Sequence, residues 1–323
     1  MFSQIINTLK NDRRKIIFTE GEDVRILEAA ARLHTEDIMD CILCGDPEKI
    51  KAAAKAGGFN IDGIEILCPA TYPEMDAMVD KMVELRKGKM TAEDCRSALQ
   101  KSNYFGTMLV KLGKADGLLG GATYSTADTV RPALQIIKTK PGNKIVSSCF
   151  ILARETAEGT EKYAMADCAI NIAPSDDDLV EIACETANTS RVFGIDPKVA
   201  MLSYSTLGSG KGESVDMVRS ATEKIKALNP NFAVDGELQF DAAFSPVVAA
   251  TKAKASAVAG KANVFVFPDI NSGNIGYKIA QRLGGFEAYG PILQGLNAPI
   301  NDLSRGCNAD EVYTMAIITL GLK

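Results

Sequence analysis

Short apolar runs rich in β-branched residues alternate with longer amphipathic stretches along most of this chain. Such alternation is typical of βα units around a mainly parallel sheet, because buried strands are apolar throughout and covering helices are apolar on one face. Helices are expected near the N-terminus and at 24–33 and 178–190, the last after the capping signature Ser175-Asp176-Asp177-Asp178. Strands are expected at 15–20, 40–45, 64–69, 117–122, 146–153, 163–168, 199–204 and 263–269.

The length of 323 residues suits two domains. The weakest joint is the Pro-Gly turn at 139–145, which precedes an expected antiparallel ribbon at 146–170, and a second punctuated region at 289–302 precedes one last helix. That helix is too short to form a domain, so we expect it to return to the first one. The prediction is two three-layer α/β domains, residues 1–143 plus 293–323 and residues 144–292, with a ligand in the cleft between them.

Charge and composition exclude several function classes. The formal charge of −5 argues against binding to a nucleic-acid backbone, which needs a basic face. The start of the chain does not read as a signal peptide, and no stretch has the length of a membrane span, so a cytoplasmic location is expected. Eight cysteines in mostly apolar runs predict buried free thiols. His34 is the only histidine, which leaves little for a catalytic triad or a histidine metal site.

The segment at 202–214 combines glycines and hydroxyls ahead of a helix expected to begin near Ser214. It fails the nucleotide-binding pattern G-x-x-x-x-G-K-[ST], since Ser205 replaces the first glycine and Gly212 replaces the hydroxyl residue. Its physics still suits an anion, because backbone N–H groups at a loop and helix start attract negative charge. The alternatives are a substrate loop that includes Ser205 and a merely flexible βα loop.

The segment at 120–137 follows an expected strand and carries paired glycines, three hydroxyls that include Thr126, and Arg131 before Pro132. Proline favours the first turn of a helix, so Arg131 is predicted at a helix start. A planar arginine fork suits a phosphate at such a position. The alternative is an ordinary surface arginine in an ion pair.

The segment at 299–321 contains the densest group of reactive side chains. Asn308 is predicted to cap a helix with an apolar face, which places Ser304 and Arg305 in the loop before that helix. The carboxylates of Asp310 and Glu311 fall within its first turn. Glu311 also stands three residues after Asn308, where a glutamate closes a capping box without doing chemistry. Catalysis and capping both remain open for this residue.

At these residues the chain resembles the phosphate acetyltransferase family over its whole length. The most specific segments are FTEGEDVRILEAA at 18–30, ELRKGK at 84–89, GGATYSTADTVRPALQIIKT at 120–139 and PINDLSRGC at 299–307. The resemblance implies two α/β domains like those of isocitrate and isopropylmalate dehydrogenases, an active site in the cleft and a homodimer. It assigns coenzyme A and phosphate contacts to Arg86, Arg131 and Arg305, with Arg25 as a further candidate.

The resemblance also implies a catalytic role for Ser304 beside Arg305, and a base six residues after that arginine. The family has aspartate at this register, whereas this chain has Glu311, with Asp310 one place earlier. The implied reaction moves an acetyl group reversibly between acetyl-CoA and inorganic phosphate, giving acetyl phosphate, with no metal and no cofactor beyond the substrate coenzyme A.

Three other functions are weighed against this reading. A phosphate butyryltransferase would do the same chemistry on a longer acyl chain. A dehydrogenase of the related fold lacks support, because no G-x-G-x-x-G segment is present. A non-catalytic regulatory domain that binds acetyl-CoA is disfavoured by the intact Ser304-Arg305-Gly306 segment.

Overall fold

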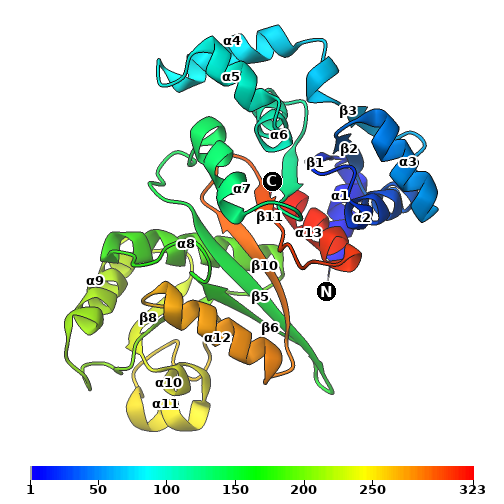
Figure 1. Ribbon diagram of the computed structural model, residues 1–323. Helices are drawn as coiled ribbons and strands as arrows, with labels where there is room; N and C mark the ends of the chain where they lie inside the picture. Colours follow the sequence, from blue (N-terminus) through cyan, green and yellow to red (C-terminus); the bar gives the residue numbers. More distant parts are fainter. Residues whose placement is uncertain (1) are drawn as a thin grey trace. The chain divides into compact units, whose positions relative to one another are not determined.

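The computed structural model describes residues 2–323. The chain divides into two compact units. We call residues 2–141 with 296–323 the terminal unit, and residues 142–295 the central unit. Both combine helices with a sheet (Figure 1), and the predicted α/β fold class is confirmed.

The sheet of the terminal unit is parallel in every strand pair that the described residues form. Its strand order is β11-β4-β1-β2-β3, so the last strand of the chain lies on the edge beside β4. The carboxyl ends of β1, β4 and β11 therefore lie next to one another. The strand bounds are β1 (Lys15–Phe18), β2 (Asp40–Cys44), β3 (Glu65–Leu67), β4 (Gly117–Gly120) and β11 (Ile300–Asp302).

The helices of the terminal unit pack on this sheet and on one another. The last helix, α13 (Ala309–Gly321), packs against α1 (Ser3–Asn11) and α2 (Val24–Thr35). Its expected apolar face is buried at Val312, Met315, Ala316 and Leu320. The other helices are α3 (Pro47–Gly57), η1 (Pro69–Thr71), α4 (Met75–Arg86), α5 (Ala92–Leu99), α6 (Ser102–Lys111), α7 (Thr126–Pro132) and the π-helical segment η2 (Ala133–Ile137).

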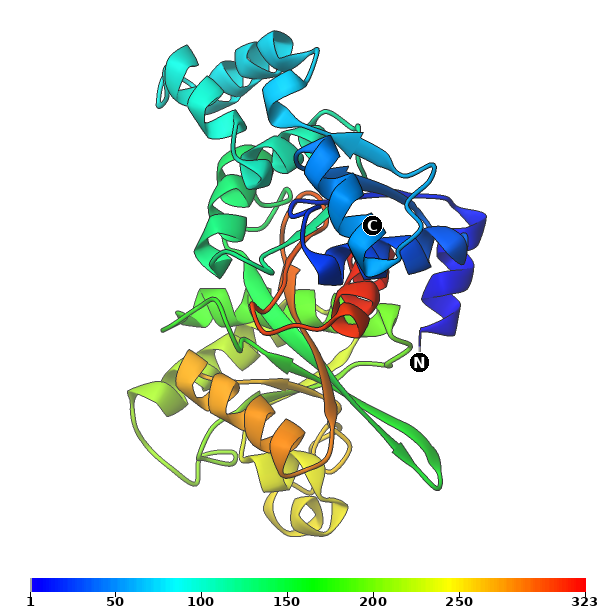
Figure 2. The same ribbon diagram turned by 45° about the vertical axis from the view of Figure 1, so that its right-hand side comes forward.

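The central unit has a mixed sheet with strand order β10-β5-β6-β9-β7-β8. The predicted antiparallel ribbon is confirmed as the pair β5–β6, the long hairpin in Figures 1 and 2. The pair β10–β5 is also antiparallel, and the remaining pairs are parallel. The strand bounds are β5 (Ser147–Thr156), β6 (Gly159–Ala166), β7 (Lys198–Leu202), β8 (Ala233–Leu238), β9 (Val264–Val266) and β10 (Glu287–Gln294).

The longest helix of the central unit is α8 (Asp176–Val192), and it begins with the predicted cap. Ser175 accepts a hydrogen bond from the Asp178 backbone N–H, and the Asp178 side chain accepts one in return from the Ser175 backbone, which closes a capping box. The other helices are α9 (Glu213–Ala227), α10 (Phe240–Phe244), α11 (Pro246–Lys252) and α12 (Ile270–Arg282).

Every predicted strand corresponds to an observed one, whereas β8, β10 and β11 were not predicted. Each of the three lacks the continuous apolar run that marked the others. Asp235, Gly236 and Glu237 interrupt β8, and β10 contains Pro291, where its register with β5 shifts. A proline removes a ladder donor, and charged residues mask the hydrophobic signal.

The prediction that Arg131 lies at a helix start is wrong. Helix α7 begins at Thr126, so Arg131 falls in its last turn. The start signal is Ser125, whose hydroxyl donates to the Asp128 carboxylate at 2.7 Å. Pro132 is tolerated because it stands where the α-helix changes to the π-helical segment η2, and its missing N–H falls at this irregularity.

Candidate active site

Three loops of the terminal unit begin at adjacent strand ends. They follow β1, β4 and β11, which neighbour one another in the sheet. In open parallel sheets, ligands bind beyond the carboxyl ends of the strands. The loops at 19–23, 121–125 and 303–308 therefore define the candidate site, and they contain the predicted residues Arg25, Thr126, Ser304 and Arg305 or lead directly into them.

The loop after β4 wraps around the carboxylate of Glu20. One oxygen of Glu20 accepts hydrogen bonds from the backbone N–H groups of Gly121 at 2.9 Å and Ala122 at 3.2 Å. The other accepts from the backbone N–H of Thr123 at 2.5 Å and its hydroxyl at 2.7 Å. Four donors thus converge on one carboxylate, and charge-assisted bonds of this kind are stronger than neutral ones.

Asp302, at the end of β11, ties that strand to helix α7. Its two oxygens accept hydrogen bonds from the hydroxyls of Thr126 and Thr129, each at 2.6 Å. The side chain is buried, and burial raises the pKa of Asp302, partly offset by the two threonine bonds. Thr126 is exposed at the helix start. The side chain of Thr126, a predicted substrate residue, is therefore fixed by its hydrogen bond to Asp302.

Arg25 lies between the loops after β4 and β11. Its guanidinium binds both oxygens of Asp23, through Nε at 2.9 Å and a terminal nitrogen at 2.8 Å. It also donates to the backbone carbonyls of Arg305 at 2.9 Å, Cys307 at 3.0 Å and Ala122 at 2.9 Å. An arginine side chain has five N–H donors, so these acceptors use all of them. The geometry gives Arg25 a holding role, and its predicted contact with substrate stays a prediction.

Ser304 and Arg305 lie exposed in the loop that Arg25 holds. The Ser304 hydroxyl accepts a hydrogen bond from the Gly306 backbone N–H at 3.2 Å. The Ser304 backbone carbonyl accepts one from the Cys307 backbone N–H at 2.9 Å, and the two bonds make a tight turn. Cys307 itself is buried. Burial raises the pKa of its thiol, only partly offset by the Arg25 charge, so it is kept protonated.

The two carboxylates at the start of α13 have different partners. Glu311 closes the predicted capping box: its Oε2 accepts from the Asn308 backbone N–H at 3.1 Å, and its own N–H donates to the Asn308 side chain at 2.9 Å. Asp310 forms an ion pair with Arg32 at 2.5 Å, and Arg32 also lies over the Tyr313 ring. Glu311 therefore caps the helix, and both carboxylates are exposed. The catalytic role of Glu311 stays a prediction.

Arg86 and Arg131 form a second group in the terminal unit. Arg86 ends α4 and donates to the Gln135 carbonyl at 3.2 Å, and the Gln135 side chain accepts from the Tyr104 hydroxyl at 3.0 Å. The Arg86 Nε is buried and has no hydrogen-bond partner among the described residues. Arg131 is 60% exposed and lies 3.9 Å from Asp128. Both arginine charges act on Tyr104, whose pKa is nevertheless raised by burial.

Ser205 belongs to the central unit and is fully buried. Its hydroxyl donates to the Glu237 carboxylate at 2.9 Å and accepts from the Gly210 backbone N–H at 2.8 Å. Glu237 also binds the Gly208 N–H and the Arg219 guanidinium. Ser205 thus shapes the Gly-rich loop from inside, and its predicted contact with substrate stays a prediction.

The described residues contain no group of three or more His, Cys, Asp or Glu side chains arranged to hold a metal ion. The eight cysteines are free, and most are buried. Cys41 and Cys44 are among the buried ones, and burial raises the pKa of both thiols to about 12. No helix formed by residues 2–323 combines the length and apolar character of a membrane span.

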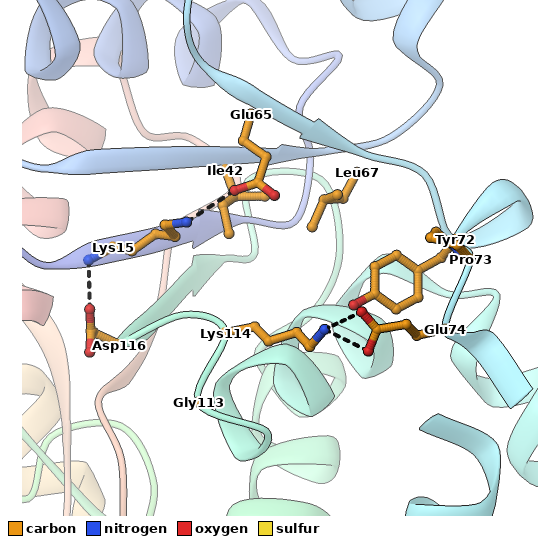
Figure 3. A pocket seen from close by; sticks show the side chains of 10 residues that line it. All are labelled: Lys15, Ile42, Glu65, Leu67, Tyr72, Pro73, Glu74, Gly113, Lys114 and Asp116. Carbon is orange, nitrogen blue, oxygen red and sulfur yellow. Dashed lines mark hydrogen bonds and ion pairs between the residues drawn. The ribbon is translucent and has the colours of Figure 1, made fainter. Parts of the chain in front are cut away.

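A pocket of about 570 Å³ lies elsewhere in the terminal unit. Lys15, Glu65 and Asp116, which line it, stand at or just before the amino ends of β1, β3 and β4. Two ion pairs join lining residues, Lys15 with Glu65 at 3.1 Å and Lys114 with Glu74 at 2.6 Å (Figure 3). Asp116 accepts a hydrogen bond from the Lys15 backbone N–H at 2.7 Å and forms an ion pair with Lys323. The pocket contains none of the predicted site residues, and its place at the amino ends separates it from the candidate site.

Glu20 and Asp302 were missed as functional candidates. Each is a single carboxylate at or just after the end of a strand, and their partners lie about a hundred or more positions away in sequence. The usable signal was their place at strand ends next to the glycines at 120 and 121, since polar groups beyond parallel strands meet at one edge of the sheet.

Comparison with known proteins finds relatives that match nearly the whole chain. The family model for phosphate acetyl/butaryl transferase matches residues 1–320. A phosphate acetyltransferase of Bacillus subtilis is 55% identical over 319 residues, 99% of this chain and 98% of the relative.

Solved structures give the same result. A phosphotransacetylase from Streptococcus pyogenes has a TM-score of 0.96 at 55% identity, covering 99% of this chain and 97% of that one. The EutD phosphotransacetylase from Staphylococcus aureus has a TM-score of 0.91 at 48% identity, covering 99% and 98%. The family model matches nearly the whole chain, and about half of the chain's residues are identical in these relatives. The chain therefore belongs to the phosphate acetyl/butaryl transferase family.

Proposed function

We propose that this chain catalyses the reversible transfer of an acetyl group between coenzyme A and inorganic phosphate. The observation that carries the proposal is the exposed Ser304-Arg305-Gly306 turn beyond three adjacent strand ends. It occurs in a chain that is 55% identical to a phosphate acetyltransferase over 99% of its length. The enzyme is accordingly an acyltransferase.

In the direction of acetyl-CoA synthesis, the coenzyme A sulfur attacks the carbonyl carbon of acetyl phosphate. A carbon–sulfur bond forms, the bond from that carbon to the phosphate oxygen breaks, and phosphate leaves with the electron pair. The thiol proton passes to a base. A thiol has a pKa of ~8.5 and is only slightly ionised near neutrality, so a base at hydrogen-bond distance assists the attack.

Arg305 offsets negative charge as it grows on the carbonyl oxygen and on the departing phosphate. Its side chain is exposed, while its backbone carbonyl is held by Arg25. A donor placed where charge develops in a transition state is worth about 3–4 kcal/mol. Ser304, adjacent in the same turn, is assigned to the reacting phosphate or carbonyl as a hydroxyl donor.

Glu311 is assigned as the base and Asp310 as its competitor. The ion pair with Arg32 supports this choice, since it engages Asp310 on the side of α2. Glu311 accepts the Asn308 N–H through Oε2, and a carboxylate has room for several further bonds on its two oxygens. Capping therefore orients Glu311 and leaves it able to accept a proton.

The binding residues are assigned to the substrate phosphates. Arg86 and Arg131, whose charges both act on Tyr104, are proposed to hold coenzyme A or phosphate, and Thr126 is proposed to contact substrate from the start of α7. Ser205 is proposed to act on the substrate through the Gly-rich loop that it supports. No metal and no cofactor beyond coenzyme A takes part in this scheme.

The assembly is proposed to be a homodimer in the cytoplasm. Helix α12 supports a second copy, because Ile275, Ile279 and Leu283 are 57%, 52% and 85% exposed along one helical stripe. Eight free cysteines suit a reducing compartment. A solution mass measurement of the wild type against Ile279→Asp tests the dimer, and a mass of one chain for the wild type would contradict it.

The function is tested by release of free thiol from acetyl-CoA in the presence of a metal chelator, with and without phosphate. We expect release only with phosphate, and faster release from acetyl-CoA than from butyryl-CoA. Equal release without phosphate would mean thioester hydrolysis and overturn the proposal. Faster reaction with butyryl-CoA would assign the longer acyl chain.

A further inference from the structure

From the contacts that join Glu20, the loop after β4, Arg25 and the Arg305 turn, we infer that Glu20 is a positioning residue of the reaction. Glu20 acts through Arg25 to fix the backbone from which the Arg305 side chain extends. The inference rests on the proposed function and adds a residue to it.

The first link is the grip of Glu20 on the loop after β4. The carboxylate accepts from three successive backbone N–H groups, those of Gly121, Ala122 and Thr123, and from the Thr123 hydroxyl. Successive N–H groups that point into one concavity form an anion-binding nest. Here the protein's own carboxylate fills the nest, which sets the direction in which the Ala122 carbonyl points.

The second link is Arg25, which donates a hydrogen bond to that carbonyl. One terminal nitrogen donates to the Ala122 carbonyl at 2.9 Å, and the other donates to the carbonyls of Arg305 at 2.9 Å and Cys307 at 3.0 Å. The planar guanidinium fixes the angle between these bonds. A displaced Ala122 carbonyl would therefore rotate or release Arg25, and the Arg305 turn would lose its support.

The arrangement requires a carboxylate and not just a side chain of this shape. Both Glu20 oxygens accept hydrogen bonds, each from two donors. In Glu20→Gln, the amide nitrogen would face one pair of these donors with hydrogens of its own. The near-isosteric change thus keeps the side-chain volume and removes two of the four hydrogen bonds between residue 20 and the loop after β4.

A positioning role has a kinetic signature that a structural role lacks. Arg305 acts on charge that develops in the transition state, so its misplacement lowers kcat. The contacts with coenzyme A or phosphate assigned to Arg86 and Arg131 lie in a separate group around Tyr104, so the KM values for acetyl-CoA and phosphate should stay nearly constant. A loss of fold alone would lower the active fraction and leave kcat per folded molecule unchanged.

The test compares Glu20→Gln with Glu48→Gln, a matched change on helix α3, outside the three loops of the candidate site. The Glu48 side chain is 87% exposed and forms a surface ion pair with Lys51 at 3.5 Å. We expect kcat to fall about 10- to 100-fold in Glu20→Gln, because misplacement by an ångström can cost that much. The KM should stay within about twofold, and Glu48→Gln should match the wild type.

A double variant tests the path through Arg25. If Glu20 acts through Arg25, Glu20→Gln combined with Arg25→Lys should lose no more kcat than the worse single variant. Multiplied losses would overturn the path. Unchanged kcat in folded Glu20→Gln, or a loss confined to KM, would overturn the positioning role itself.

Thr123→Val keeps the inference testable if Glu20→Gln does not fold. It removes only the hydroxyl donor from an exposed position. A kcat loss of roughly 3- to 10-fold at constant KM supports the inference, and full activity overturns it. A wild type without phosphate-dependent activity would instead refute the proposed function, so the two failures are distinct.

Discussion

Glu311 combines a capping role with the proposed role of base, and Glu311→Gln separates the two. Glutamine at this position can still accept the Asn308 N–H, since glutamine also closes a capping box. It cannot accept the thiol proton as a carboxylate does. The substitution therefore removes the base and keeps the cap.

The magnitudes differ enough to decide between the roles. Loss of a general base costs about 10²- to 10⁴-fold in rate, or roughly 3–5 kcal/mol at the tenfold equivalent of 1.36 kcal/mol. Loss of the cap costs about 1 kcal/mol of stability, which for a chain of this size shifts the melting temperature by only about 2–4 °C. Glu311→Gln should therefore melt with the wild type, and Glu311→Ala should melt a few degrees lower.

Asp310→Asn is the matched control. The Asp310 side chain is 82% exposed and pairs with Arg32, and a surface ion pair contributes about 0–1 kcal/mol. We expect kcat within about twofold of the wild type in this variant. The assay is kcat and melting temperature on parallel preparations. A large kcat loss in Asp310→Asn with Glu311→Gln nearly fully active would refute the assignment and make Asp310 the base.

Three further predictions follow from the site. Arg131→Ala should raise the KM for coenzyme A or phosphate with kcat little changed, whereas Arg96→Ala, which removes an exposed partner of Asp76, should change neither constant. An unaltered KM in Arg131→Ala would mean that Arg131 is an ordinary surface arginine. Gly121→Ala should destabilise the protein more than Gly113→Ala, for which only the ~1 kcal/mol of left-handed backbone strain is expected. The added Cβ at position 121 would lie 2.3 Å from Asp302, so equal melting temperatures for the two variants would contradict this prediction. Burial raises the Asp302 pKa in the folded state, so the stabilisation from this group is present at low pH and is lost as pH rises from 3.8 through the raised pKa. Over that pH range, the unfolding free energy of the wild type should fall relative to that of Asp302→Asn, and a constant or increasing difference would contradict the pKa direction.

Local signals in the sequence predicted the elements well where one stretch of chain carries all the information. The Asn308–Glu311 capping box and the apolar face of α13 follow from spacing alone, and both are present. The predicted helix start near Arg131 is wrong because Pro132 also suits an irregular junction, and the actual start signal at Ser125 lies six residues before Arg131.

The contacts between distant segments could not be predicted in this way. Arg25 reaches the carbonyls of Arg305 and Cys307 across some 280 positions, and its sequence neighbourhood does not distinguish a substrate contact from a backbone contact. Glu20 likewise reads as an isolated carboxylate until β1 and β4 pair. Strand order decides which loops meet, and it is a property of the whole fold.

Acetyl transfer to inorganic phosphate can be followed by phosphorus NMR of acetyl-CoA with phosphate and this enzyme. We expect an acetyl phosphate signal to appear in step with free thiol, and added acetyl phosphate and coenzyme A to regenerate the thioester. Thiol release with no acetyl phosphate signal, under conditions where acetyl phosphate itself persists, would contradict this expectation.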